Sequence, residues 1–467
     1  MGLELTITLV ALVFAGIILV IDRKISQRVL STMGRRRYKD GLGGVDKGET
    51  LWAWQNGKFR KATVEDENEA SSPESDQDRS FTVAFEDETD AKDSVASSLI
   101  RKGSDEPSNL CGHEWHRLRK KEIARKHPEI RKLKALPKWV YPTILGSFLV
   151  LHLAVGAGIF FLDKFTEVSM WAVVLWTIAL AATVGAYFAY AFQQLTHEVC
   201  HSPNGGTLFA KLFAVAGDIT VGTSGPNLSI YYFAGHLTHH KNTGGVGDPD
   251  YVLHSHWAIL PKMFGKSRLG RLTWITLFSL FTFEFMQIEH WLGRYNVPHI
   301  KKPGKKILAL VLMKYAFMAL TWWLGGFWCF LYFKLAGGFA MGAFGHPYAG
   351  FWLMQHMSHP KNGYQPTVSY GGSYLWNWMT FGELYHVEHH DFPNIPFNKI
   401  YEVRKIAPEY YEDLWVVDSV CKLSWEWISH TDGTPWMEVA GALDSMHFGE
   451  ERDPTHRPAP EVKAAGG

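Results

Sequence analysis

Two pairs of long apolar segments constrain the fold of this 467-residue chain more than any other feature. Residues 139–161 and 171–192 are each long enough to cross the ~30 Å hydrocarbon core of a bilayer as a helix, and a short polar connection joins them. The second pair, residues 307–324 and 327–344, is divided by two glycines. Because a backbone in lipid must form its hydrogen bonds within its own segment, we expect a mostly α-helical integral membrane protein with two transmembrane helical hairpins.

The positions of the basic residues set the expected orientation in the membrane. A helical hairpin leaves and re-enters the bilayer on one side, so residues 22–138, 193–306 and 345–467 should share one face. Lys and Arg residues follow position 22 and precede position 139, and such residues collect on the cytosolic side. We therefore expect all three segments to face the cytosol.

Both ends of the chain and one internal segment fall outside the two hairpins. Residues 1–22 are an apolar run that begins with Glu4 in place of a positive charge, which predicts a retained N-terminal membrane anchor and not a cleaved signal peptide. Residues 273–288 are short for a span and carry Glu284, which indicates an interfacial or re-entrant helix. Residues 431–467 are expected to be a flexible C-terminal tail.

Charge and cysteine content argue against several classes of function. The 47 Lys and Arg residues balance 46 Asp and Glu residues, so no basic excess points to a nucleic-acid partner. The four cysteines contain no Cys-x-x-Cys pair, which argues against a disulfide framework or a zinc ribbon. The 19 tryptophans instead suit a membrane protein, in which aromatic side chains anchor at the interfaces.

A small domain is expected before the first hairpin, in residues 45–103. Alternating apolar residues flank Asn56-Gly57, which is a strong hairpin signal, and residues 80–85 and 95–101 provide further strand patterns around acidic, Ser-rich stretches. The sequences WAWQNGKFRKATV and SFTVAFED resemble Tudor or SH3-like β-barrels, which implies a small β-barrel with an acidic loop and a peptide partner. Four aromatic residues are expected to line a peptide-binding cage or to pack in the barrel core: Trp52, Trp54, Phe59 and Phe85.

Residues 114–138 are rich in Lys and Arg and predict a basic juxtamembrane helix. This helix would connect the small domain to the membrane-spanning part of the chain. Its position directly before the first span favours a solvated amphipathic helix whose basic side chains face lipid headgroups.

Eight of the 22 histidines occur in three tight clusters on the expected cytosolic face. These residues are His197 and His201; His236, His239 and His240; and His386, His389 and His390. Residues four apart share one face of a helix, so the two histidines of the first cluster can bind one ion together. In each His-x-x-His-His cluster we expect positions i and i+3 to converge with i+4 beside them, which suits two metals served by one helical turn. Imidazole binds iron, copper, zinc and nickel, so the residue type alone does not name the metal.

The first cluster, HEVCH, also fits the HExxH motif of zinc proteases, with Glu198 as general base. A catalytic zinc keeps three protein ligands and a water, however, and eight clustered histidines exceed that need. The three clusters therefore favour two metal ions.

The order HxxxH, HxxHH and HxxHH around two apolar hairpins resembles the membrane fatty-acid desaturase superfamily. Within it, YHVEHHDFPNIPFNKIYEVRKIAPEYYEDL (385–414) and WHRLRKKEIARKHPEIRKL (115–133) are most similar to the sphingolipid (dihydroceramide) Δ4-desaturases. The resemblance covers about residues 114–420. It implies a desaturase domain over residues 139–430, with a cytosolic helical cap that holds a di-iron centre.

The resemblance also implies a reaction and its cofactors. Two iron ions and O2 would remove hydrogen from an unactivated methylene group and introduce a Δ4 double bond into the sphingoid base of dihydroceramide. The sequence has no HPGG-like haem motif and no nucleotide-binding glycine loop, so electrons are expected from cytochrome b5 and its reductase. The implied location is the endoplasmic reticulum membrane, as a multi-pass protein with a membrane lipid as substrate.

One departure from the family pattern affects the expected ligands. Upstream of the third cluster the family has a GHFxxEH-like pattern, whereas this chain reads GHPYAGFWLMQHMSHP. His356 stays in register and is expected to be a ninth ligand. Supporting positions around the ligands are expected for His346, His359, Glu198 and Glu388, of which the two acidic residues lie inside the first and third clusters.

Other activities remain open at this point. A sphingolipid C4-hydroxylase or an acyl-lipid desaturase would begin with the same abstraction of hydrogen. Residues 241–255 contain a Gly-rich turn into Asp-Pro-Asp that is similar to carotenoid ketolases, which keeps a carotenoid ketolase or hydroxylase open. A non-enzymatic alternative is a lipid-binding scaffold that uses the β-barrel, although eight clustered histidines argue against it.

Overall fold

This computed structural model describes the chain in separate stretches between residues 47 and 417. They are residues 47–48, 50–55, 58–68, 80–85, 92–96, 100–101, 112–133, 136–203, 206–222, 235–243, 267–282, 305–348, 367–371, 374–412, 414 and 416–417. The expected N-terminal anchor (1–22) and C-terminal tail (431–467) lie outside the described residues, as do His356 and His359. Those predictions stay predictions.

Three helical segments are long and apolar enough to cross a membrane, so the chain is a membrane protein. Large apolar side chains such as Trp171 and Leu175 are exposed on them, as expected where a helix faces lipid. Ser169 caps the second segment by accepting a hydrogen bond from the backbone N–H of Ala172. The segments are α3 (Val140–Phe165); Met170–His201, which joins α4 (Met170–Leu180), the π-helical turn η4 (Ala181–Gly185) and α5 (Ala186–His201); and Leu308–Ala340, within α12 (Lys305–Ala340).

Helix α12 changes direction at Gly326. This residue has a φ of 75° and a ψ of −179°, a conformation that glycine adopts readily and other residues rarely do. The ring centroids of Phe317 and Phe333 are 5.0 Å apart, whereas sixteen residues of a straight helix span ~24 Å. The chain therefore folds back on itself, and the Lys164 side chain beside Gly326 shows that it does so at the same end of the bundle as the α3–α4 connection.

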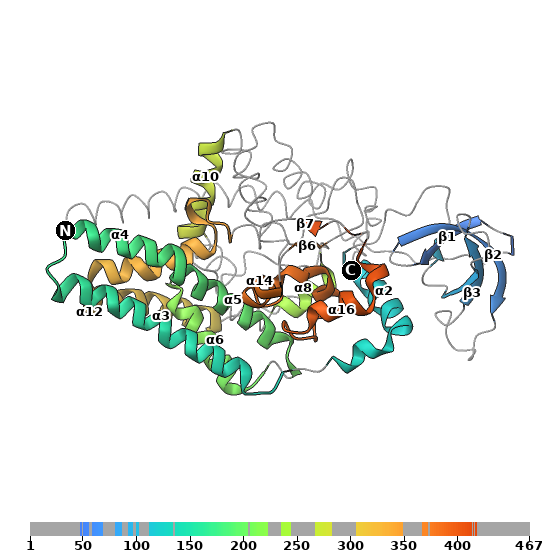
Figure 1. Cartoon of the computed structure of the whole chain (residues 1–467), viewed down its shortest axis with the longest axis horizontal. Helices are drawn as coiled ribbons and strands as arrows, with labels where there is room; N and C mark the ends of the chain where they lie inside the picture. Colours follow the sequence, from blue (N-terminus) through green and yellow to red (C-terminus); the bar gives the residue numbers. More distant parts are fainter. Residues whose placement is uncertain are drawn as a thin grey trace, which may run out of the picture.

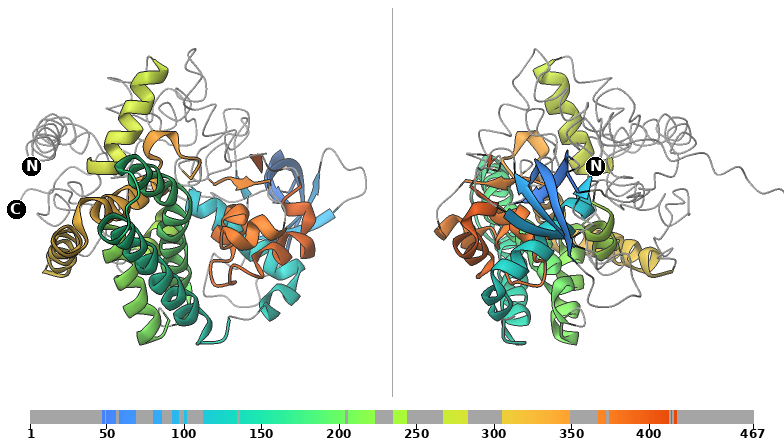
Figure 2. Two further views of the ribbon diagram at one scale, coloured as in Figure 1. Left: turned by 60° about the vertical axis from the view of Figure 1, so that its left-hand side comes forward. Right: turned by 90° about the vertical axis from the view of Figure 1, so that its right-hand side faces the viewer.

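A group of shorter helices forms a cap at the other end of the bundle (Figure 1). Figure 2 shows the two layers from further directions, with the green bundle helices beside the cyan and orange-red cap helices. The cap elements are α2 (Gly112–Lys126), η3 (Pro128–Lys132), α8 (Leu237–Asn242), β6 (Ser369–Tyr370), α14 (Tyr374–Met379), η10 (Glu383–Tyr385), α15 (His386–Asp391), α16 (Ile400–Ile406), η11 (Pro408–Tyr410) and β7 (Val416–Val417).

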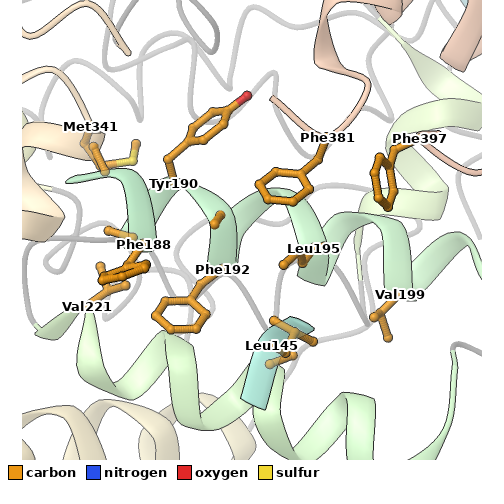
Figure 3. Close-up of a cluster of buried hydrophobic side chains, with 14 of the residues drawn as sticks. Leu145, Phe188, Tyr190, Phe192, Leu195, Val199, Val221, Met341, Phe381 and Phe397 are labelled. Carbon is orange, nitrogen blue, oxygen red and sulfur yellow. The ribbon is translucent and has the colours of Figure 1, made fainter. Parts of the chain in front are cut away.

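Helix α5 is the centre of the hydrophobic core that joins the bundle to the cap. Its apolar side chains are buried at nearly every position. Figure 3 shows Phe188, Phe192 and Leu195 along α5, with Phe381 above the helix and Leu145 of α3 below it. Because α5 ends in the first histidine cluster, this packing fixes the position of that cluster relative to the membrane-spanning helices.

Helices α6 and α10 and the turns η8 and η9 lie on or near α12. Helix α6 (Leu208–Thr220) lies against α3, α5 and α12. Helix α10 (Arg268–Leu277) continues into the π-helical turn η8 (Phe278–Thr282), next to η9 (Ala343–Gly345). The Ser279 hydroxyl donates to the carbonyl oxygen of Met341 at 2.7 Å. The helix predicted at residues 273–288 is thus present and starts earlier, and residues 283–288 lie outside the described part of the chain.

The predicted small domain contains a five-stranded antiparallel sheet with strand order β4-β3-β2-β1-β5. Pairing of Gln55 with Lys58 confirms the hairpin predicted on either side of Asn56-Gly57. Among the described strands no pairing joins β4 to β5, so a closed Tudor- or SH3-like barrel is not supported. Alternation predicts strands and turns, whereas closure depends on strand tilt and stagger, and β5 is only two residues long. The strands are β1 (Thr50–Gln55), β2 (Lys58–Asn68), β3 (Ser80–Phe85), β4 (Lys92–Ala96) and β5 (Ile100–Arg101).

The aromatic residues of the predicted cage are described only by their backbone positions. Trp54 pairs with Phe59 across β1 and β2, and Phe85 pairs with Ala62 across β2 and β3. Trp52 pairs with Lys61 on one side and Arg101 on the other. The side chains of the four aromatics lie outside the described side chains, so the aromatic cage stays a prediction.

The interpretation of α2 as a solvated flank was wrong for one of its faces. Arg117, Lys120 and Lys121 are exposed, as a basic surface helix requires. Trp115 and Arg119, however, are fully buried against the cap, where α2 packs on α8 and α15. The buried face was missed because its few apolar residues are scattered among charged ones, so the segment was assigned to the headgroup region and not to a protein core.

Candidate metal centre

The three histidine clusters lie on three separate helices, one at the end of the bundle and two in the cap. The first occupies the last turn of α5, and the second begins at His236 and continues into α8. The third occupies the short helix α15, which follows Gly382 with a φ of 82°. Seven of the eight clustered histidines are buried, and His240 is half-buried. The fold therefore brings together all eight residues that were predicted from the sequence.

Five histidines converge on one point. The ligand nitrogens of this group all lie within 4.8 Å of one another. Nε2 of His236 lies 3.0 Å from Nε2 of His201 and 2.9 Å from Nε2 of His240, and Nε2 of His389 lies 3.3 Å from that of His240. The fifth member is His197.

These spacings suit a metal ion. For a metal–nitrogen bond of roughly 2.1 Å, nitrogens on a common ion lie about 3.0 Å apart at right angles and about 3.4 Å apart in a tetrahedron. The nitrogen pairs, at 2.9–3.3 Å, lie in or just below that range. The residues present therefore fit a first-row transition metal, for which imidazole is a suitable ligand.

The remaining three histidines form a second group beside the first. The ring centroid of His390 lies 4.6 Å from that of His386 and 5.2 Å from that of His239. His390 also stacks on His240 of the first group, with centroids 4.2 Å apart. Among the described residues, the first group is the one whose ligand nitrogens all lie within 4.8 Å of one another, so a second metal beside His239, His386 and His390 stays a prediction.

The division within each His-x-x-His-His cluster differs from the prediction. Positions i and i+4 stay together, since His236 pairs with His240 and His386 with His390, whereas i+3 joins the other group. Around the axis of an α-helix, the side chain four residues further on points about 40° past that of residue i. The side chain three residues further on points about 60° short of it. The i+4 side chain is thus the nearer neighbour, and the expectation that i and i+3 converge was wrong.

Burial favours the neutral form of three of the clustered histidines. It is the main cause that lowers the pKa of His236, His240 and His389 well below the usual value of 6.5, and neighbouring imidazoles lower it further. Only the neutral imidazole has a free lone pair for a metal ion. The site is therefore poised to bind a cation at neutral pH without first releasing protons.

Glu383 supports the second group of histidines and was missed in the sequence. Its Oε1 lies 3.0 Å from Nδ1 of His386, and both side chains are buried. A carboxylate at the far nitrogen orients an imidazole ligand and raises its basicity. The available signal was the spacing Glu-x-x-His, which places the two residues one turn apart.

The two acidic residues inside the clusters form hydrogen bonds to residues other than histidine. Glu198 accepts hydrogen bonds from the Tyr141 hydroxyl at 3.0 Å and the backbone N–H of Phe397 at 2.9 Å. Glu388 accepts from Ser369 at 2.8 Å and from Arg404. Each carboxylate thus fastens its own helix to a neighbouring segment. Among the described residues, neither carboxylate forms the expected hydrogen bond to a clustered histidine, because each is engaged by these other partners.

His346 lies outside the two histidine groups. Its Nε2 lies 2.9 Å from the carbonyl oxygen of Ala182, in the π-helical turn η4, and its ring packs against Phe339 and Tyr348. It therefore joins the segment after α12 to the middle of the second spanning helix. His346 was predicted to support the ligands, but it makes this structural contact instead.

A second polar cluster that the sequence did not reveal surrounds Asp391. This carboxylate is fully buried and contacts His116 and Arg119 of α2 and Tyr411 near η11. These residues are separated from Asp391 by 275, 272 and 20 positions. Contacts over such separations carry no local sequence pattern.

Comparisons with known proteins agree with this geometry. The sphingolipid delta(4)-desaturase DES1 of Gallus gallus is 28% identical over 337 residues, which cover 70% of this chain and 92% of that protein. The sphingolipid delta(4)-desaturase/C4-monooxygenase DES2 of Rattus norvegicus is 27% identical over 69% of this chain and 91% of its own length. The sphingolipid delta(4)-desaturase of Candida albicans is 25% identical over 70% of this chain and 85% of its own length. No solved structure matches the chain.

The family model described as fatty acid desaturase matches residues 169–420, more than half of the chain. This range begins at the connection between α3 and α4 and contains all three histidine clusters. The chain therefore belongs to the fatty acid desaturase family.

Proposed function

We propose that this protein is a sphingolipid Δ4-desaturase that introduces a double bond into the sphingoid base of dihydroceramide. The observation that carries the proposal is the convergence of three histidine clusters at the end of a membrane-spanning bundle. Its substrate class is supported by the similarity to Δ4-desaturases, which spans about 70% of this chain and most of each relative.

The metal centre would hold two iron ions. His197, His201, His236, His240 and His389 would bind one ion, and His239, His386 and His390 the other, with His356 as a further candidate ligand. When bound, the iron ions would allow O2 to act as the oxidant that removes hydrogen from an unactivated methylene group. Removal of two hydrogens and reduction of O2 to two waters consumes two further electrons and two protons, which we assign to cytochrome b5 and its reductase.

The chain's own residues would determine where this chemistry acts. Burial of the histidines excludes water from the centre, and neutral imidazoles leave the lone pairs free. Glu383 orients His386, and the contacts of Glu198 with Tyr141 and Phe397 hold the end of α5 against the cap. Selective attack on one methylene group requires such a rigid frame, because small displacements of the substrate change which hydrogen is reached.

The membrane arrangement that fits this function has two helical hairpins. Helices α3 and α4–α5 would form the first, and the two halves of α12 on either side of Gly326 the second. Both would place the histidine clusters on the cytosolic side of the endoplasmic reticulum membrane. The exposed basic residues of α2 support this side, because positive charges collect there.

C4-hydroxylation of the same lipid is the second candidate. One observation favours it, namely that the similar DES2 protein of Rattus norvegicus is named both a delta(4)-desaturase and a C4-monooxygenase. Both reactions begin with loss of hydrogen from the same region of the sphingoid base, so the histidine groups serve either.

Lipid profiling tests the proposal. The full chain would be expressed in a yeast that makes no Δ4-unsaturated sphingoid bases, and its long-chain bases analysed by mass spectrometry. We expect sphing-4-enine with the wild-type chain and none with His389→Ala, which still inserts into the membrane. Additional 4-hydroxylated base would favour the hydroxylase, and an unchanged sphingoid profile in cells that contain iron-loaded protein would refute both activities.

A further inference from the structure

The polar cluster at Asp391 links α2 to the third histidine cluster. Asp391 is 0% exposed. Its Oδ1 lies 2.7 Å from Nδ1 of His116, and its Oδ2 accepts hydrogen bonds from Nε of Arg119 at 3.1 Å and the Tyr411 hydroxyl at 2.9 Å. The imidazole of His116, the guanidinium of Arg119 and the phenol of Tyr411 therefore form hydrogen bonds to a carboxylate that would otherwise be costly to bury.

His116 uses both of its ring nitrogens in this cluster. Because a carboxylate only accepts hydrogen bonds, Nδ1 carries the proton that is shared with Asp391. Nε2 then accepts a hydrogen bond from the Thr367 hydroxyl at 3.0 Å. With both nitrogens engaged, His116 has no lone pair left for a metal ion, although it is as deeply buried as the clustered histidines.

The cluster directly adjoins the ligand candidates. Asp391 follows His390 in the sequence, and the ring of His116 lies 5.0 Å from the ring of His390, measured between centroids. Packing makes the contact rigid, because the Arg119 guanidinium lies over Trp115 at 4.3 Å and over Tyr411 at 4.8 Å. Any shift of α2 would therefore be transmitted to α15.

We propose that His116 and Asp391 are positioning residues of the metal centre, through which α2 holds α15 and its three histidines in place. The basic segment before the first span would then support the metal ligands without binding the metal itself. The identity of the metal as iron rests on the proposed function. The positioning role itself concerns metal retention and needs no assumption about the lipid substrate.

The experiment measures iron retention by the full-length protein purified in detergent. Each variant is loaded with ferrous iron, its iron content is determined by mass spectrometry, and the half-life of the bound iron is followed by absorbance after addition of a ferrous chelator. His116→Leu removes both hydrogen bonds, whereas His116→Gln keeps an amide donor and an acceptor. His127→Leu is the matched control, because His127 lies just after α2 and contacts Glu409 at the surface, away from the histidine groups.

We expect His116→Leu to release iron about tenfold faster than the wild type, since loss of supporting partners commonly costs ten- to a hundredfold in metal affinity. His116→Gln should stay within about threefold of the wild type, and His127→Leu should match it. Equal half-lives for His116→Leu and the wild type would overturn the proposal. So would a His116→Gln variant that releases iron as fast as His116→Leu, because simple packing and not the hydrogen bonds would then be responsible.

A folding defect in His116→Leu does not block the test. Asp391→Asn keeps the shape of the side chain and removes its charge, and it should also release iron about tenfold faster; wild-type retention by this variant overturns the proposal. A wild-type chain that binds no iron overturns it together with the metal centre. A wild-type chain that retains iron but leaves dihydroceramide unchanged refutes only the proposed function.

Discussion

A buried ion pair between α6 and the spanning helix α12 allows a quantitative prediction about stability. Nζ of Lys314 in α12 lies 2.9 Å from Oδ1 of Asp218 in α6, and the two side chains are 0% and 1% exposed. Charged residues at such depth are costly unless they are paired. We predict that Lys314→Met strongly destabilises the protein, because Asp218 is left buried without its cation.

The size of the effect follows from the burial of the pair. Removal of one partner from a buried ion pair costs about 3–5 kcal/mol. For a domain of 150–250 residues, each kcal/mol lowers the Tm by roughly 2–4 °C. We therefore expect the Tm of Lys314→Met to fall by about 6–20 °C.

The control is a second Lys–Asp pair, which joins two adjacent residues and whose lysine is exposed. Lys164 lies 2.8 Å from Asp163 at the end of α3, but its side chain is 51% exposed. An exposed pair contributes about 0–1 kcal/mol, so Lys164→Met should change the Tm by about 4 °C or less. Replacement of both buried charges in Lys314→Met/Asp218→Leu should recover most of the loss, because a buried pair can be exchanged for apolar groups at little cost.

Thermal unfolding of the purified protein in detergent, followed by tryptophan fluorescence, measures all four proteins under the same conditions. The predicted destabilisation is refuted if Lys314→Met unfolds within about 2 °C of the wild type. Its proposed cause is refuted if the double variant is no more stable than Lys314→Met, since the loss would then come from the shape of the lysine and not from the uncompensated carboxylate.

Two further predictions concern the segment just before α15. Glu383→Leu removes the carboxylate beside Nδ1 of His386, so we expect a loss of about ten- to a hundredfold in iron affinity, measured by titration with ferrous iron; wild-type affinity would show that His386 needs no such support. Gly382→Ala places a Cβ 2.9 Å from Cα of Phe397 at a residue with a φ of 82°. We therefore expect the unfolding free energy to fall by about 1–3 kcal/mol, measured by thermal unfolding. An unchanged Tm would contradict this expectation of strain.

The features that could be predicted from the sequence are those with a local period or a fixed spacing. Apolar runs predicted the spans because the width of a bilayer demands a minimum helix length. The three histidine clusters could be recognised because their members lie within one helical turn of each other. The Asn-Gly motif predicted the β1–β2 hairpin for the same reason, since a turn is decided by a few adjacent residues.

The supporting structure around the histidines had no such pattern. Asp391 meets His116 across 275 positions, and Glu198 meets the backbone of Phe397 across 199. Neither contact follows from the residues beside it in the sequence. Helix geometry pairs i with i+4 in each His-x-x-His-His cluster, but which group each pair joins depends on how α5, α8 and α15 are rotated against one another.

By itself, then, the sequence determined that this chain crosses a membrane and carries three histidine clusters of a desaturase, because both depend on local spacing. The tertiary structure alone decided which histidines share a group, that Glu198 and Glu388 fasten helices, and that α2 buries one face against α15. The physical reason is that these properties are set by packing between helices that are distant in the sequence. Such packing depends on the joint shape of many side chains and has no period that a single segment could reveal.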